Sequence, residues 1–141
     1  MAYQISWLVE GRVMQIIVNG TTTVEEIQDQ ALSLTKYLDN GQGPLVHTFI
    51  DLLQLENFPI NLSLLNNSMA STLQHSKVGW NIVITSNRMV KFLTSLVMQL
   101  SKVRFRTFAT WEEGIAFLND MDSTLPDLSP LHASTPPNVN A

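Results

Sequence analysis

The reactive side chains in this sequence are carboxylates and histidines, because the chain contains no cysteine. Asp51 is the most suggestive acid, since it ends a strand-like run and ligands of open α/β sheets bind outside the carboxyl ends of strands. A catalytic acid there would need a partner, and Glu56 in the adjoining segment is the nearest one in sequence. The alternative, which we favour, is that Asp51 only accepts hydrogen bonds from loop amides.

The three histidines have no spacing that suggests a metal site. His47 lies inside a strand-like run, which is typical of a structural histidine. His75 follows a helix, where a cation is favourable against the helix dipole, and His132 lies near the end of the chain. The His-Glu-x-x-His, Gly-x-Ser-x-Gly, Gly-x-Gly-x-x-Gly and Walker patterns are all missing from the sequence. The sequence therefore predicts no metal, no cofactor and no catalytic constellation.

Alternating runs of β-branched and aromatic residues predict five strands. The first two surround Glu10-Gly11 and should form a hairpin in which Gly11 has a positive φ, and Gly20 should end the second strand. Lys102, Arg104 and Arg106 would project from one face of the last strand and protect a sheet edge from pairing. The five ranges are Tyr3 to Val9, Arg12 to Val18, Leu45 to Asp51, Trp80 to Thr85 and Val103 to Phe108.

Four amphipathic helices are predicted from apolar residues at three- and four-residue steps. Each follows residues that can accept a hydrogen bond from the first turn of the helix. In chain order these residues are Thr22 or Thr23, Asn61, Ser86 or Asn87, and Thr110.

The third helix has the clearest apolar stripe, which we expect to pack on the sheet. Val90 and Met98 lie off that stripe and are candidate interface positions. Lys91 is the one charge within the stripe region, so binding to anionic lipid is poorly supported. The stripe consists of Met89, Phe92, Leu93, Leu96, Val97 and Leu100.

The order β-β-α-β-α-β-α-β-α predicts a single α/β domain with a mixed, mostly parallel five-stranded sheet. Because polar residues alternate with apolar ones along the strands, we expect the helices mainly on one face and the other face to be largely wet. The domain should span residues 1–122. Residues 123–141 read as a Pro-, Ser- and Asn-rich tail, whose first part Leu125, Leu128 and Leu131 could pin to the body.

With Ile50-Asp51-Leu52 ending the third strand, this layout resembles the STAS domain, the SpoIIAA-like fold of anti-sigma-factor antagonists. The resemblance covers roughly residues 3–122 and implies helices gathered on one side of the sheet. Regulatory members carry an Asp-Ser-Ser-Gly-type motif whose serine accepts phosphate at a helix N-terminus, where the amides favour an anion. Here the matching stretch is Phe58 to Ser63, which lacks the acid, the tandem serines and the glycine, and Ser63 lies about one position late.

Four short segments are also similar to those of uncharacterised bacterial proteins of comparable length, a likeness that implies no function. They are Ile5 to Trp7, Val78 to Trp80, Val103 to Arg106 and Thr124 to Leu128.

Composition narrows the class of protein further. A net charge of −4 argues against nucleic-acid binding, which needs a basic stripe. The start lacks a signal-peptide pattern and no apolar run approaches the ~18–20 residues of a membrane span, so cytoplasm is the default compartment. Charged residues make up only 14% of the chain. Such a surface is weakly protected against self-association, and a homo-oligomer and a neutral monomer are about equally expected.

We therefore expect a non-catalytic interaction or regulatory module that docks a protein partner or a second copy of itself, for example as a homodimer. The alternative is a small-ligand domain for a nucleotide, lipid or other anion. Such a ligand would lie where helix N-termini meet the carboxyl end of the third strand, near Asp51, Asn61, Ser86 and Asn87.

Overall fold

A computed structural model describes residues 3–134 of the chain and contains five strands and five helices within that range. The strands are β1 (Tyr3–Val9), β2 (Val13–Thr21), β3 (Val46–Asn57), β4 (Val78–Ile84) and β5 (Phe105–Phe108). The helices are α1 (Val24–Asp39), α2 (Leu62–Leu73), α3 (Arg88–Leu100), α4 (Trp111–Met121) and α5 (Ser129–Ser134).

The strands form one sheet in the order β1-β2-β3-β4-β5. β1 is antiparallel to β2 and the remaining neighbours are parallel, so the expected mixed, mostly parallel sheet is confirmed. Gly11 makes the hairpin turn with φ +73°, as predicted. β5 is an edge strand, and Arg106 on it and Arg104 just before it are exposed.

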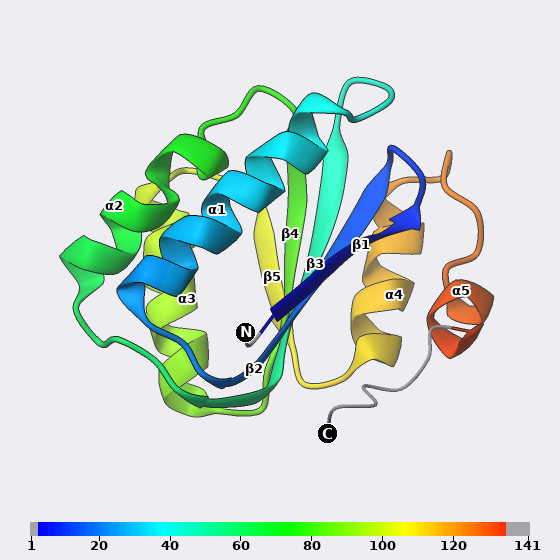
Figure 1. Cartoon of the computed structure of the whole chain (residues 1–141). Helices are drawn as coiled ribbons and strands as arrows, with labels where there is room; N and C mark the ends of the chain where they lie inside the picture. Colours follow the sequence, from blue (N-terminus) through cyan, green and yellow to red (C-terminus); the bar gives the residue numbers. More distant parts are fainter. Residues whose placement is uncertain (1–2, 135–141) are drawn as a thin grey trace.

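Helices cover both faces of the sheet (Figure 1): α1, α2 and α3 lie on one side, and α4 and α5 lie on the other. Most of the helical mass is on one face, as expected, but the prediction that the opposite face is largely wet is wrong. Phe49, Ile82 and Ile84 of the sheet are buried there against Trp111, Ile115 and Leu118 of α4.

Polar residues in the strands misled the prediction because protein groups, rather than water, satisfy them. His47 is buried, and its two ring nitrogens contact the Trp80 amide and the Asp122 carboxylate. Asn81 is also buried, and its Nδ2 donates to the Arg104 carbonyl at 3.2 Å. A hydrogen-bonded polar side chain can be buried at little net cost, so alternation in sequence does not imply an open face.

α4 approaches the sheet closely because it carries a glycine at the contact. A Cβ added to Gly114 would lie 3.0 Å from side-chain atoms of both Ile82 and Ile84. The chain after α4 continues this layer, since Leu125 and Leu128 are buried in the same cluster. Residues that read as the start of a tail therefore pack on the body, and 135–141 lie outside the described residues.

Strands β2 and β3 run further than predicted. Gly20, expected to end β2, has φ +66° and pairs with Leu55 beside an irregularity in the ladder. Glycine in this conformation makes a bulge, so the ladder bends and continues instead of stopping. β3 consequently continues to Asn57, six residues beyond its predicted end at Asp51.

The helix starts agree with the predicted caps. Thr23 Oγ1 accepts the Glu26 amide at 3.2 Å, which selects Thr23 over Thr22 as the first cap. Asn61, Asn87 and Thr110 cap the next three helices in the same way.

α3 ends in a turn that delays the last strand. Lys102 has φ 57°, its amide donates to the Gln99 carbonyl, and the Val103 amide donates to that of Met98. This is the Schellman pattern of helix termination. β5 therefore begins at Phe105 rather than at the predicted Val103.

Candidate functional site

Asp51, the most suggestive acid, is held by two donors. Its Oδ1 accepts the Leu53 amide at 3.0 Å, as expected of a loop-binding acid, and its Oδ2 accepts the indole N–H of Trp111 at 2.8 Å. The second bond ties β3 to the start of α4. Glu56 is exposed further along β3. The two acids therefore do not share an enclosed site.

The polar residues proposed to hold an anion at helix N-termini are used by the helices themselves. Asn61 Oδ1 accepts the Leu64 amide at 3.0 Å, and Asn87 Oδ1 accepts the Met89 and Val90 amides at 2.9 and 3.1 Å. Ser63 and Ser86 are exposed at the same helix starts. An anion site here stays a prediction, and these caps leave fewer free amides for it.

The assignment of the two sides of α3 from the sequence is correct for Leu93 and Val97, which are buried as expected, but wrong for several other positions. Val90 and Met98, the candidate interface positions, are 2% and 4% exposed and lie in the core. Met89, Phe92 and Leu100, expected to pack on the sheet, are 50–58% exposed. Both sets have helical spacing, and the periodicity alone could not identify which one faces the sheet.

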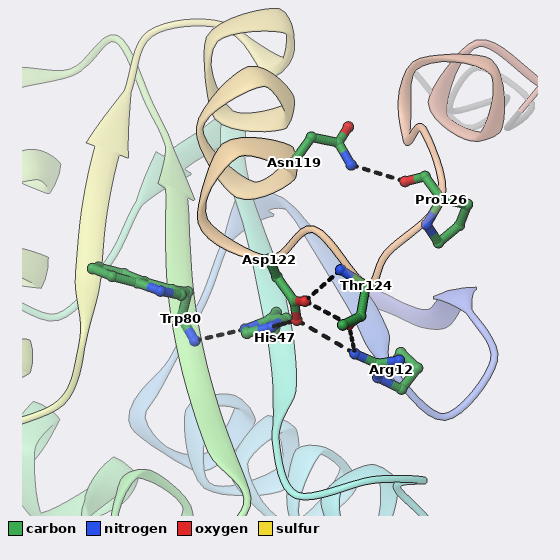
Figure 2. A network of polar contacts seen from close by, with 7 residues as sticks. All are labelled: Arg12, His47, Trp80, Asn119, Asp122, Thr124 and Pro126. Carbon is green, nitrogen blue, oxygen red and sulfur yellow. Dashed lines mark hydrogen bonds and ion pairs between the residues drawn. The ribbon is translucent and has the colours of Figure 1, made fainter.

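A polar network that the sequence did not reveal connects the sheet, the hairpin turn and the end of α4. Figure 2 shows the His47 ring between the backbone of Trp80 and the carboxylate of Asp122. The Trp80 amide donates to His47 Nδ1 at 3.0 Å, and His47 Nε2 is 2.9 Å from Asp122 Oδ2. Arg12 Nη2 lies 3.3 Å from the same carboxylate oxygen and 2.8 Å from Thr124 Oγ1.

These contacts fix the tautomer of His47. Nδ1 accepts a backbone hydrogen bond and so carries no proton, which leaves the ring proton on Nε2, where it is donated to Asp122. Both nitrogens are occupied and the side chain is only 3% exposed. His47 is therefore a structural residue without a free nitrogen for acid–base chemistry.

Asp122 remains ionised in this network. Hydrogen bonding from the Thr124 hydroxyl lowers the pKa of Asp122 to about 2, helped by His47 and by the Thr124 amide, while partial burial opposes the shift. Gly79 makes room for the ring, since a Cβ there would lie 2.5 Å from His47 Nδ1. The network clamps the segment after α4 against the sheet.

A stack of three rings supports the same layer. Trp111 lies between Phe49, at 4.6 Å between ring centroids, and His132 of α5, at 4.3 Å. His132, expected in a tail, is thus part of the second face. Within residues 3–134, no group of three His, Asp or Glu side chains is arranged to hold a metal ion.

An apolar cavity of about 130 Å³ lies on the opposite face, between the sheet and helices α1, α2 and α3. Three of the side chains that line it are polar, namely Thr22, Gln30 and Thr94, and none is charged. The cavity is partly open to the surface, since Leu55, Phe58 and Leu65 among its lining residues are only partly buried. A site for a ligand is one reason for a domain to retain such a void.

α2 forms one wall of this cavity and is tied to α1 by Thr72, whose hydroxyl donates to the Ala31 carbonyl at 2.8 Å. Leu65 and Met69 of α2 are only partly buried where they line it, and the helix contains no charged residue. Exposed apolar side chains flank the lining residues in sequence: Leu53, Ile60 and Leu64 are 40%, 67% and 45% exposed.

The outer face of α3 is apolar and basic. Met89, Phe92 and Leu100 are exposed, and Leu96 is partly exposed between them, which gives a continuous stripe at helical spacing. Arg88 and Lys91 are exposed beside it. Between Asn57 and Trp111 there is no acid, and this stretch holds six of the eight Lys and Arg residues: Lys77, Arg88, Lys91, Lys102, Arg104 and Arg106.

Together, the strand order and the main helical layer define a SpoIIAA-like α/β fold. A similar solved structure is an uncharacterised protein of the DUF3478 family with a SpoIIAA-like fold from Shewanella loihica. The two chains share 16% sequence identity with a TM-score of 0.60, over 83% of this chain and 92% of that one. No family model and no curated protein matches the sequence. At this identity the likeness establishes the fold alone.

None of the helices between residues 3 and 134 combines the length and hydrophobicity needed to cross a membrane.

The features that sequence reasoning missed share one cause. The clamp joins residues 12, 47, 122 and 124, and the cavity joins three strands and three helices, so neither has a local pattern. The acid-free stretch between Asn57 and Trp111, with its six cations, is visible in the sequence and could have indicated the basic outer face of α3.

Proposed function

We propose that this protein is a non-catalytic interaction module that docks a partner protein through the outer face of α3. The observation that carries the proposal is the exposed stripe Met89, Phe92, Leu96 and Leu100, because a row of large apolar side chains on a helix is costly to leave in water. A helix face of this kind fits the groove or helix of a partner.

The charges beside the stripe indicate what the partner carries. Arg88 and Lys91 border the apolar residues, and Lys102 and Arg104 lie in the segment between α3 and β5. A second copy docking through the same face would bring these cations together, since a twofold interface pairs a patch with itself. An acidic partner surface with an apolar centre is therefore the better complement.

Affinity capture from the source cell with three forms of the full chain tests this proposal. Phe92→Ser removes the centre of the stripe and should abolish capture, and Lys91→Glu should weaken it most at low salt. Leu32→Ser is the matched control, because Leu32 is also apolar and 65% exposed but lies on α1. Equal capture by Phe92→Ser and the wild type would reject the α3 face as the docking surface.

The molar mass of the purified protein in solution, measured over a range of concentrations, shows whether the chain associates with itself. We expect a monomer whose mass does not change with concentration. A stable dimer that Phe92→Ser dissociates would instead mean that the partner is a second copy.

A further inference from the structure

We propose that the cavity between the sheet and helices α1–α3 binds the hydrocarbon chain of a fatty acid or another single-chain amphiphile. This site is distinct from the proposed docking face, since it lies on the inner side of α3. Val90, Val97 and Met98 line the cavity, while Met89 and Phe92 point away from it.

The lining of the cavity selects an apolar ligand. Gln30 Nε2 donates to Thr22 Oγ1 at 3.3 Å, and Thr94 Oγ1 donates to the Val90 carbonyl at 2.8 Å. Polar groups of the lining are therefore already hydrogen-bonded to other protein groups. A water molecule in a cavity needs two to four polar partners, and apolar cavities that lack them stay dry. A nucleotide or a sugar would lose its hydration here without replacement.

The size of the cavity sets how much ligand it accepts. Its volume of about 130 Å³ is close to that of an engineered protein cavity of roughly 150 Å³ that binds benzene. The site therefore holds about six carbon atoms as it stands. A longer chain would need the first turns of α2 to move outward, which breaks no ion pair because α2 carries no charge, while Thr72 near its end keeps the helix hydrogen-bonded to Ala31 and Thr35 of α1.

The surface next to the cavity suits a ligand with one polar end. Leu55, Phe58 and Leu65 line the cavity but are only partly buried, so they border the outside. The exposed side chains of Ile60 and Leu64 extend this apolar path onto the surface. A chain can enter along it while its polar head stays in water.

Titration calorimetry of the full chain with saturated fatty acids from about three to sixteen carbons tests the proposal, since the cavity as it stands holds about six carbons. We expect saturable binding whose affinity rises about fourfold per methylene, the factor for burying one CH₂ group, until the cavity is full. A second arm uses vesicles containing a fluorescently labelled lysophospholipid, which has a single acyl chain. Uptake of the label would identify the membrane as the source of the chain, whereas binding of free fatty acid alone would identify the soluble pool.

Two substitutions on α3 locate the binding site. Thr94→Phe places a ring in the cavity and should lower the affinity at least tenfold. Ser95→Phe adds the same ring one residue later, at a position that does not line the cavity, and should change the affinity less than twofold. Met69→Trp fills the cavity from α2 and is the second cavity-filling variant, to be measured if Thr94→Phe does not fold. Equal affinities of a folded cavity-filling variant and Ser95→Phe, or the absence of saturable binding, would overturn the proposal.

Discussion

Replacing Asp122 by asparagine tests the clamp between α4 and the sheet. In the folded protein the pKa of Asp122 is lowered from 3.8 to about 2, chiefly by the Thr124 hydroxyl. A group whose pKa is lower in the folded than in the unfolded chain stabilises the fold above its unfolded pKa, and this stabilisation disappears as pH falls through the folded pKa. The carboxylate should therefore contribute fully at pH 7 and lose its effect between pH about 4 and 2.

The size of the effect follows from the two pKa values. A difference of about 1.8 corresponds to at most about 2.4 kcal/mol. Because the Asp122 side chain is 21% exposed, water screens part of this, and we expect about 1–2 kcal/mol.

Urea denaturation followed by tryptophan fluorescence gives the free energy of unfolding of both proteins. Asp122→Asn should be about 1–2 kcal/mol less stable at pH 7, about half of that deficit should remain at pH 3, and little should remain at pH 2. Asp120→Asn, an exposed residue on the same helix, controls for the loss of one negative charge. A deficit that does not change between pH 7 and pH 2 would refute the role assigned to the carboxylate.

Three further substitutions test the packing. Gly79→Ala should lower the stability by about 1–3 kcal/mol, because the new Cβ would lie 2.5 Å from His47 Nδ1, and an unchanged Tm would contradict this contact. Trp111→Phe should cost about 1–3 kcal/mol in urea denaturation, since Asp51 Oδ2 loses its indole donor, and the idea fails if the loss is near zero. Phe92→Ser should change the unfolding free energy by less than about 0.5 kcal/mol, whereas Val90→Ala should lower it by about 1–3 kcal/mol. A larger loss for Phe92→Ser than for Val90→Ala would mean that α3 faces the other way.

Local signals in the sequence predicted most of the fold. The capping positions Thr23, Asn61, Asn87 and Thr110 are correct because a cap depends on contacts within one helical turn. The hairpin at Gly11 is correct for the same reason. The order of elements then restricts the sheet topology, since parallel neighbours need crossover helices.

Errors arose where a distant segment decides the outcome. The polar alternation around His47 suggested solvent on that face, but its partner is Asp122, which is 75 residues away. The face of α3 depends on where the helix meets the sheet, and two sets of apolar residues at similar spacing compete for that contact. Gly20 breaks a strand in isolation, yet pairing with β3 carries the ladder past it.

The separation of charge along the chain has a consequence at distances beyond contact. Cations gather in the β4–α3–β5 part of the molecule, whereas all twelve acids lie before or after the acid-free stretch. This local concentration of cations attracts an acidic surface toward α3 before any side chains meet. At physiological ionic strength this attraction acts only over roughly 8 Å, so the rate of productive encounters should fall as salt is added.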